Sequence, residues 1–380
     1  MSGTAWKRIM SMERSASSSA KPRVLFILHL PPPVHGAAMM GRVIRESRLV
    51  ADSFDGRFVN LSASESLSEV GRFSFRKLSL VFRLLRTVGN QLRMFHPDLV
   101  YLTPASSGLG LLKDCLSVWM VRRQGIRTVL HFHNKGVSLH QDRFHYDRLY
   151  RFLFRDAKVI LLSGRLYPDV ERYVAREDVS ICPNGIDGTV CPAREGEAAA
   201  QLLFFSNLLP SKGVVDLLDA CRILMERGYR FSCRLVGAPS ASITAERLGE
   251  LVAERNLEAV VRYDGPVYGQ DKHAVWAGAD LLVHPTRDDS FPLVILEAMA
   301  AGLAVVSTRE GGIPDEVEEG VTGILCRKED PAALAEAIGF LLEHPDLRRE
   351  MGTAGSVRYK KLFTQEAFEH RFVKILEQYV

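Results

Sequence analysis

The stretch Arg287–Gly312, RDDSFPLVILEAMAAGLAVVSTREGG, decides the fold of this chain. It follows an apolar run at 279–284 that is typical of a buried strand. Pro292 suits the first turn of a helix, because its missing N–H costs nothing there. Residues 293–301 are helix-prone, and residues 303–307 return as a second apolar strand. The pattern predicts strand, turn, helix and strand, which is one unit of a parallel sheet.

The turn of this unit combines backbone amides with carboxylates. Ser290 is placed to cap the helix, and free amides at a helix N-terminus favour a phosphate group. Asp289 lies beside them, and Glu297 follows eight residues later. Because ionised carboxylates only accept hydrogen bonds, they suit hydroxyl groups on either side of that phosphate. A ligand with hydroxyls, then phosphate, then hydroxyls is a nucleotide sugar.

These residues resemble a known family. The spacing of Asp289 and Glu297, followed by AMAAG at 298–302 and GGIP at 311–314, is similar to the donor motif of retaining GT-B glycosyltransferases, family 4, the glycosyl transferases group 1. The resemblance implies that Asp289 contacts sugar hydroxyls and that Glu297 contacts the ribose. The family more often has Glu where Asp289 stands, and Asp reaches less far. The donor-binding residues implied in this stretch are Asp289, Ser290, Phe291, Pro292, Leu293, Val294 and Glu297.

The composition is that of an ordinary globular protein with more than one domain. With 380 residues, 47% hydrophobic and 25% charged, the chain is long for a single core. Its six cysteines show no CxxC spacing, so we expect them to be reduced, as in a cytosolic protein. No apolar run reaches the length needed to cross a bilayer. Residues 1–21 are Ser-rich without an apolar core, which predicts a disordered tail and not a signal peptide.

The net charge of +4 is unevenly divided. Residues 1–190 carry 28 Lys and Arg against 16 Asp and Glu, whereas residues 191–380 carry 21 against 29. The first half is therefore expected to face something anionic. Within it, segment 70–97 has six basic residues and no acidic one, and a second basic cluster follows at 143–155. A sheet-covering helix with solvated arginines explains the first segment equally well, but together the clusters predict reversible docking on the anionic cytoplasmic membrane face.

Strands and helices alternate through the first half of the chain. Amphipathic helices are expected at 73–95 and 109–123, and the expected strands lie at 24–29, 58–61, 98–102, 127–132 and 159–163, the last closing the sheet. This alternation predicts a parallel, doubly wound α/β sheet. In the loop after the first strand, Gly36 lets a phosphate or sugar approach the backbone or simply makes a tight turn. That loop lacks the GxGxxG spacing of dinucleotide-binding folds.

Two histidines mark the end of the strand expected at 127–132. His133 stands just past it, where loops of such sheets form ligand sites. The family places a histidine here near the donor sugar, so the resemblance makes His133 a candidate catalytic residue, against the alternative of a buried or capping histidine. His131 is expected to be buried and to point the other way if the strand continues that far.

The second half repeats the alternation. ICPNGID at 181–187 resembles the family's domain boundary, and residues 188–200 are small and polar, as in a linker. Strands are expected at 202–206, 231–236, 260–263 and 323–326, and helices from Val214, from Pro314 and at 331–343. Together with the Arg287–Gly312 unit, these elements predict a second domain over 201–363.

Further donor-side candidates lie at strand ends of this second domain. Lys212 follows the first strand and can neutralise a diphosphate as a point charge. Asn207 stands where the family usually has Arg, so it can only hydrogen-bond. The resemblance adds Gly237 at the end of the next strand and Val267 in the loop that holds the nucleotide base.

The alternation of elements and the resemblance together predict a GT-B protein of two Rossmann-like domains, 22–187 and 201–363, and the resemblance implies that a helix at 364–380 crosses back to the first domain. Its predicted reaction moves a sugar from a nucleotide-diphosphate sugar to a hydroxyl of a glycan or lipid-linked acceptor. The catalytic candidates are His133, Lys212, Asp289 and Glu297. No DxD sequence or metal-ligand spacing occurs, so no metal is expected. Neither another cofactor nor a nucleic-acid partner is expected. The alternatives are another GT-B activity, such as a nucleotide-sugar epimerase or a phosphorylase, and a non-catalytic nucleotide-sugar-binding protein.

Overall fold

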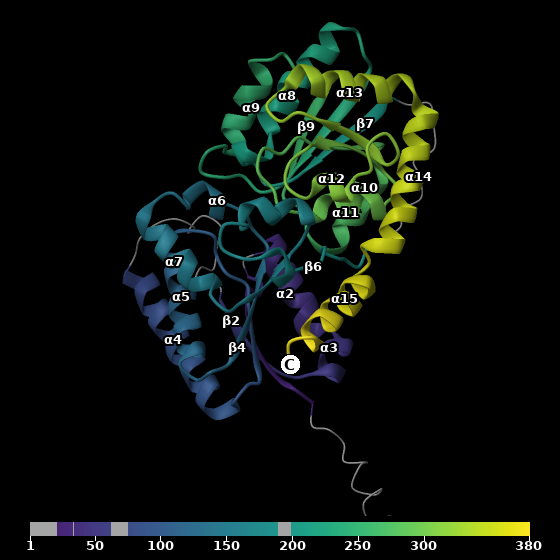
Figure 1. Ribbon diagram of the computed structural model, residues 1–380. Coiled ribbons are helices and arrows are strands. Elements are labelled where there is room, and N and C mark those ends of the chain that lie inside the picture. Colours follow the sequence, from purple (N-terminus) through teal and green to yellow (C-terminus); the bar gives the residue numbers. More distant parts are fainter. Residues whose placement is uncertain (1–20, 33, 62–74, 189–198) are drawn as a thin grey trace, which may run out of the picture.

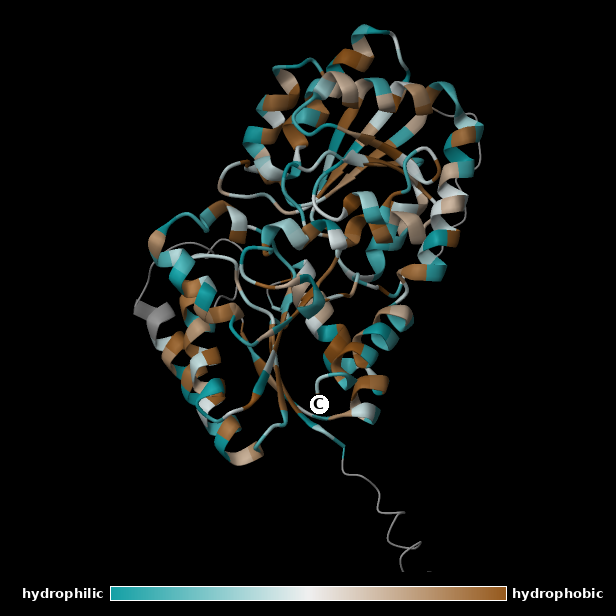
Figure 2. Cartoon of the chain, in the orientation of Figure 1, coloured by the Kyte–Doolittle hydropathy of each residue, from teal (hydrophilic) through white to brown (hydrophobic). Residues whose placement is uncertain are grey.

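The apolar runs of the chain form the strands of two parallel six-stranded sheets (Figure 1). The computed structural model describes residues 21–32, 34–61, 75–188 and 199–380, with the backbone alone for residues 75–78. The strands of both sheets are mostly hydrophobic, whereas the covering helices mix hydrophobic and hydrophilic residues (Figure 2). Each sheet is buried on both faces, as parallel sheets require. The predicted α/β class with two Rossmann-like domains is confirmed.

The first sheet has the strand order β2-β1-β3-β4-β5-β6. Its strands are β1 (Arg23–Leu28), β2 (Asp55–Asn60), β3 (Leu99–Leu102), β4 (Arg127–Phe132), β5 (Lys158–Leu161) and β6 (Val179–Ile181). The prediction that the strand at 159–163 closes this sheet is wrong, because β6 pairs outside β5 with Leu161 opposite Ile181. The β6 sequence, VSI, is short and only half-buried, so its pattern carries little strand signal.

Helices cover both faces of the first sheet. On one face, α4 (Phe75–Phe95) packs on α5 (Gly108–Arg122), which packs on α7 (Phe144–Phe154). The opposite face carries α2 (Gly36–Glu46) and α3 (Arg48–Ser53). The short α6 (Val137–His140) follows β4 at the end of the sheet that faces the second domain (Figure 1).

The second sheet has the strand order β12-β11-β10-β7-β8-β9. Its strands are β7 (Ala200–Phe205), β8 (Phe231–Val236), β9 (Val261–Gly265), β10 (Leu281–His284), β11 (Ala304–Thr308) and β12 (Gly323–Cys326). Its helices are α8 (Val214–Glu226), α9 (Ala245–Ala253), α10 (Lys272–Ala277), α11 (Leu293–Ala300), α12 (Ile313–Glu316) and α13 (Pro331–Glu343). The chain reverses direction across the sheet between β7 and β10, which is where doubly wound sheets bind ligands.

Two C-terminal helices tie the domains together. The sequence reasoning did not foresee α14 (Pro345–Leu362), which packs on α11 of the second domain, whereas α15 (Gln365–Glu377) lies on the first domain, as predicted (Figure 1). Phe368 and Phe372 of α15 are fully buried, and the ring of Phe372 meets Tyr101 of β3 edge-on at 5.2 Å. The crossover therefore shares the core of the first domain. The described parts of the chain hold no helix that is both long and apolar enough to span a membrane.

Several predicted features lie outside the described residues. These are the tail at 1–20, most of the linker (189–198), Cys191, Arg72 and the side chains of Arg76 and Lys77. The cysteines that are described, at 115, 182, 221, 233 and 326, are buried free thiols, as expected.

Candidate active site

The strongest group of charged side chains lies at the switch point of the second sheet. Lys212 follows β7, and Asp289 follows the adjacent strand β10. The Lys212 Nζ lies 2.7 Å from Asp289 Oδ2, and both side chains are largely buried. The structure therefore brings together two predicted catalytic residues that are 77 positions apart.

His284, the last residue of β10, holds the same carboxylate. Its Nε2 lies 3.0 Å from Asp289 Oδ2, so the proton on that nitrogen donates to the carboxylate. Burial opposes ionisation of Asp289, but the hydrogen bond from His284 and the charge of Lys212 lower its pKa to about 2. Asp289 is therefore ionised at neutral pH. Sequence reasoning missed His284, although a histidine that ends a strand was the signal used for His133.

The turn into α11 is shaped by backbone contacts and not by a side-chain cap. The prediction that Ser290 caps this helix is wrong, because Pro292 occupies the N-cap position and no side chain caps the helix. The Ser290 carbonyl instead accepts the Gly312 amide at 2.7 Å, and the Phe291 carbonyl accepts the Asn184 side-chain amide at 3.1 Å. The N-terminal amides of α11 thus have no side-chain cap among the described residues and are available to an anion. Leu293 and Val294 are half-buried in this first turn.

Glu297 lies one turn into α11 and has a partner that the sequence reasoning did not predict. Both of its carboxylate oxygens lie 2.5–2.6 Å from the Nζ of Lys272, which starts α10. The same ammonium sits over the Phe205 ring at 5.1 Å. Lys272 is one of several polar residues in its segment, and nothing in its sequence context marks it.

The rim of the second sheet holds the remaining donor-side candidates. The Asn207 Oδ1 accepts the Ala238 amide at 3.3 Å, so Asn207 braces the loop after β8. In that loop Gly237 adopts a φ of +153°, and a Cβ there would meet the Ser206 carbonyl at 1.9 Å. Gly213, beside Lys212, has a φ of +75°, and its Cβ would meet the Pro285 carbonyl at 1.9 Å. Both glycines are required by close backbone approach. Val267 is half-buried beyond β9.

Across the domain junction, the first sheet presents histidines. Gly36 begins α2, and a Cβ there would touch the Leu293 side chain at 4.0 Å, which places this loop opposite the start of α11. His35 caps α2, its Nδ1 accepting the Ala38 amide at 3.3 Å. Its ring lies 5.6 Å from that of His29, which hydrogen-bonds Thr103 at 3.3 Å. Sequence reasoning did not single out His29 or His35.

His133 belongs to the same group. The ring centroids of His131 and His133 are 4.2 Å apart, so the expectation that they point in opposite directions is wrong. Residues two apart in a strand lie on the same face, which explains the contact. His131 bonds the Tyr101 hydroxyl at 2.8 Å, whereas both ring nitrogens of His133 are buried without a partner among the described residues. Burial and the neighbouring His35 lower the pKa of His133 to about 3, so it is neutral at pH 7.

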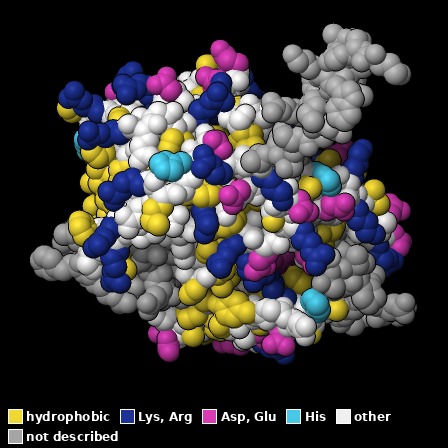
Figure 3. All heavy atoms as spheres, turned by 90° about the horizontal axis from the view of Figure 1, so that it is seen from below, with side chains coloured by type: hydrophobic (Ala, Val, Ile, Leu, Met, Phe, Trp, Pro, Cys, Tyr) yellow, Lys and Arg dark blue, Asp and Glu magenta, His cyan; other side chains and the backbone are white. Residues whose placement is uncertain are grey.

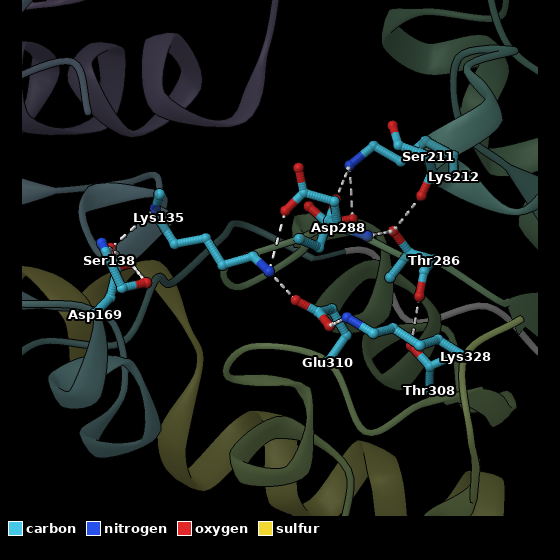
Figure 4. Close-up of polar contacts among 12 residues, drawn as sticks. Lys135, Ser138, Asp169, Ser211, Lys212, Thr286, Asp288, Thr308, Glu310 and Lys328 are labelled. Atoms are coloured by element: carbon cyan, nitrogen blue, oxygen red, sulfur yellow. Dashed lines mark hydrogen bonds and ion pairs between the residues drawn. The ribbon is translucent and has the colours of Figure 1, made fainter. Parts of the chain in front are cut away.

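Lys135 connects the two domains directly. Its ammonium, on the loop after β4, lies 3.1 Å from Asp288 and makes an ion pair with Glu310, as Figure 4 shows. Lys328 approaches the other oxygen of Glu310 at 2.8 Å. A second link joins Arg165 to Asp315 at 2.8 Å. A cavity of about 440 Å³ lies at this junction, lined by Lys135, Ser138, Arg165, Asp169, Arg309, Glu310 and neighbouring residues.

The site is thus a junction between a charged wall and a wall of neutral imidazoles. Among the described residues, no group of three or more His, Cys, Asp or Glu side chains is arranged to hold a metal ion. A polar ligand would meet ionised carboxylates, ammonium groups and uncapped helix amides on one side and imidazole nitrogens on the other. That chemistry suits a molecule with both phosphate and hydroxyl groups.

Comparison with known proteins assigns both halves of the chain. The family model Glycosyl transferases group 1 matches residues 193–358, and the model Glycosyltransferase Family 4 matches residues 46–189. Each half of the chain is therefore similar to one domain of such glycosyltransferases. The segment matched by the group 1 model contains Lys212, Asp289 and Glu297, and the segment matched by the family 4 model contains His133.

Curated relatives match parts of these domains. A D-inositol 3-phosphate glycosyltransferase of Streptomyces scabiei is 35% identical over 206 residues, 49% of this chain and 46% of that protein. A putative colanic acid biosynthesis glycosyltransferase of Escherichia coli, WcaL, is 29% identical over 218 residues, 54% of this chain and 53% of that protein. The chain thus matches about half the length of these relatives.

Solved structures share the GT-B fold over most of the chain. Sucrose-phosphate synthase of Thermosynechococcus elongatus superimposes with a TM-score of 0.74 at 20% identity, covering 94% of this chain and 99% of that one. Anabaena HepE in complex with UDP gives a TM-score of 0.72 at 18% identity, covering 94% of this chain and 100% of that one. At these identities the likeness concerns the fold alone.

Proposed function

We propose that this protein is a retaining glycosyltransferase that moves a sugar from a nucleotide-diphosphate sugar to a hydroxyl of a glycan or lipid-linked acceptor. The observation that carries the proposal is the ion pair of Lys212 and Asp289 at 2.7 Å beside the uncapped start of α11. Two of the relatives that match the chain are named as glycosyltransferases, one of inositol 3-phosphate and one of colanic acid biosynthesis. HepE, which shares the fold, was solved with UDP.

On the donor side, the diphosphate is assigned to the α11 N-terminus and Lys212. Both carry positive charge, and both lie at the switch point between β7 and β10. Asp289 then accepts hydrogen bonds from sugar hydroxyls, because it is ionised and keeps one oxygen that neither Lys212 nor His284 occupies. Donor binding requires Lys212 to exchange part of its contact with Asp289 for the phosphate.

The nucleoside end is assigned to Glu297. Its carboxylate accepts ribose hydroxyls while Lys272 holds it in place and neutralises its charge. Val267 and the loop after β9 border the base, and Asn207 and Gly237 fix the neighbouring loop. This order along the second sheet matches sugar, diphosphate and nucleoside.

The leaving diphosphate is stabilised by Lys212 and the helix amides, without a metal ion in this proposal. No side chain is assigned as a nucleophile; the departing phosphate helps deprotonate the acceptor hydroxyl, which attacks the same face of the sugar. His133, being neutral, hydrogen-bonds the sugar from the first domain. The protein contributes positioning and charge stabilisation.

The acceptor is assigned to the first domain, with its excess of basic residues. A lipid-linked acceptor would be met at the anionic cytoplasmic face of a membrane, where each basic residue near the surface contributes about 1 kcal/mol. In this proposal the protein works in the cytoplasm as a peripheral membrane enzyme.

A thermal-shift screen across UDP-, GDP- and ADP-sugars tests the donor site. A matching donor at 100 times its dissociation constant raises the unfolding free energy by about 2.7 kcal/mol. Glu297→Ala should lose this shift, whereas the exposed control Glu350→Ala should keep it. Absence of any shift across the three classes would remove the nucleotide-sugar assignment.

Product analysis then tests the chemistry. Slow donor hydrolysis without an acceptor, in buffer with a chelator, is expected, and NMR of the transferred sugar should show the anomeric configuration of the donor. An inverted product would exclude the retaining mechanism, and activity lost in chelator and restored by a divalent cation would exclude metal independence. Donor binding without hydrolysis or transfer would favour the non-catalytic alternative.

A further inference from the structure

Helix α5 of the first domain exposes large apolar side chains on its outer side, in addition to those that it buries in the core. Its most exposed large side chains recur at helical spacing: Leu109 (56% exposed), Leu112 (45%), Leu116 (40%) and Trp119 (46%). We call these four residues the α5 stripe. A helix on the surface of a soluble domain ordinarily turns such a face toward the core.

The inward side of the same helix combines core residues such as Leu111 and Val118 with a buried ion pair. Lys113 and Asp114 form an ion pair at 2.7 Å with side chains 8% and 0% exposed, and Ser117 is fully buried beside them. Asp114 also accepts the Ala105 amide at 2.8 Å. These contacts fix the rotation of α5, so the helix cannot turn the α5 stripe inward without breaking a buried ion pair.

Exposed arginines lie on α4 and α7 and at the end of α5. The Arg123 guanidinium lies over the Trp119 ring at 4.9 Å, and Arg148 of α7 lies over the exposed Phe144 ring at 5.1 Å. On α4, Arg83 and Arg86 are exposed near Phe82 in sequence. At the left edge of Figure 3, on the side where Figure 1 places these helices, hydrophobic side chains lie next to Lys and Arg.

The three helices themselves carry little negative charge. The helices α4, α5 and α7 contain two acidic residues, Asp114 and Asp147. The first is buried, and the second is bound to Arg151 at 2.7 Å and to Tyr173 at 3.0 Å. An apolar stripe with Trp and Arg at its border, on a surface of positive charge, complements the interface of an anionic bilayer.

We propose that the α5 stripe enters the headgroup boundary of an anionic membrane, with the arginines of α4, α5 and α7 binding lipid phosphates. The inference rests on the proposed membrane encounter but identifies a surface that the basic segment 70–97 alone did not indicate. Docking through α5 leaves the junction with the second domain uncovered, because α5 covers a side face of the sheet (Figure 1).

Vesicle co-sedimentation with the full chain tests the proposal. The wild type should sediment with vesicles of phosphatidylglycerol and phosphatidylcholine, less so as salt rises, and should stay in solution with phosphatidylcholine alone. The variant Leu112→Glu/Leu116→Glu/Trp119→Glu should lose binding by at least about tenfold. The matched control Phe340→Glu/Val357→Glu changes exposed apolar residues of the second domain and should bind as the wild type does.

Two further measurements separate a loss of membrane binding from a loss of folding. Thermal unfolding and donor-induced thermal shift should be unchanged in the triple variant; if it is destabilised, Leu109→Ser/Leu112→Ser/Leu116→Ser replaces it. Brominated lipid should quench the wild-type tryptophan fluorescence, and Trp119→Phe should remove that quenching.

Each remaining outcome overturns the inference in a distinct way. Vesicle binding that survives the α5 substitutions but is lost in Arg83→Glu/Arg86→Glu would leave membrane docking standing without the α5 stripe. A wild type that stays in solution at low salt would overturn docking altogether. Self-association abolished by the triple variant, without vesicle binding, would make the stripe a contact between two copies. Donor hydrolysis, measured without vesicles, reports on the proposed function independently.

Discussion

The two walls of the domain junction differ in the charge of their polar side chains. On the second domain, Asp289 is ionised and bound by Lys212 and His284, and Glu297 is held by Lys272. On the first domain, burial lowers the pKa of His29 and His133 to about 3, so these imidazoles stay neutral. A charged wall suits a phosphate and its flanking hydroxyls, whereas a neutral wall can hydrogen-bond a sugar without attracting the diphosphate. We therefore expect the second domain to govern donor affinity and the first domain to govern only the positioning of the sugar.

Removing a charge from the charged wall of the second domain should have the largest effect on the rate of sugar transfer. We expect Lys212→Ala and Glu297→Ala each to abolish transfer, by about a thousandfold or more for the cation at the leaving group. Both side chains lie at the rim of the sheet and not in its core, so thermal unfolding should change little. Steady-state assays at saturating donor measure the loss of transfer activity. Lys361→Ala, a substitution of an exposed lysine, is the matched control. Near-native turnover in either variant would remove that residue from the site.

A smaller loss is expected on the neutral wall. His133→Ala should lower turnover by about a hundredfold, because one positioned hydrogen-bond partner is removed. Since the pKa of His133 is near 3, the pH–rate profile of the wild type should show no limb from this residue between about pH 5 and 8. NMR titration of the imidazole, with the exposed His370→Ala as control, checks the neutral form. A titration midpoint near 6.5 would contradict the proposed contrast between the walls.

The same depressed pKa sets the sign of a stability effect. The folded-state pKa of His133 lies below the usual 6.5, so its contribution is fully present above that pH and is lost as pH falls toward about 3. Denaturant titrations across this window measure the effect. The unfolding free energy should fall less with pH in His133→Ala than in the wild type, because the variant lacks the buried imidazole.

Substitutions of Asp289 test how closely the charged wall is matched to the sugar. Asp289→Glu restores the commoner family carboxylate and should be tolerated or should shift donor preference. Asp289→Asn should lose about tenfold or more, since a charge-assisted bond is roughly twice as strong as a neutral one. Competition assays between donor sugars measure both effects, with the exposed Asp346→Asn as control. Equal rates for the Asn variant would exclude Asp289 from the sugar contact.

The smallest effect concerns a buried carboxyl behind the charged wall. Glu316 of α12 is 0% exposed, and neither of its oxygens has a hydrogen-bond partner among the described residues. Burial, with the nearby charges of Asp289 and Asp315, raises its pKa well above 4.5. Stability is therefore lost as pH rises above 4.5 toward the folded-state value. Glu316→Met should raise the unfolding free energy at pH 7 by about 1–3 kcal/mol and flatten this slope; chemical denaturation, with the exposed Glu336→Met as control, measures it. A destabilised Met variant would show that Glu316 has a polar role.

Local sequence determined the order of elements and part of the site. Apolar runs such as 231–236 became strands with the predicted bounds, and residues 279–312 became β10–α11–β11. Lys212 and Asp289 could be assigned to one donor site in advance because each follows a strand of one parallel sheet, and such strands end at the same edge. Periodicity and strand-end position are short-range signals, and a single chain displays them fully.

The rest was decided by contacts between distant segments. His284 and Lys272 became partners of Asp289 and Glu297 only through packing, and Lys135 reaches Glu310 across 175 positions. The short β6 is a strand because β5 offers it an edge, which its own three residues do not announce. Helix α5 shows the limit most clearly: its sequence has apolar residues all round, and the buried Lys113–Asp114 pair, not the count of leucines, fixes which side faces out. Hydrophobic periodicity tells that a helix forms, but only the tertiary partners of its polar groups determine its rotation.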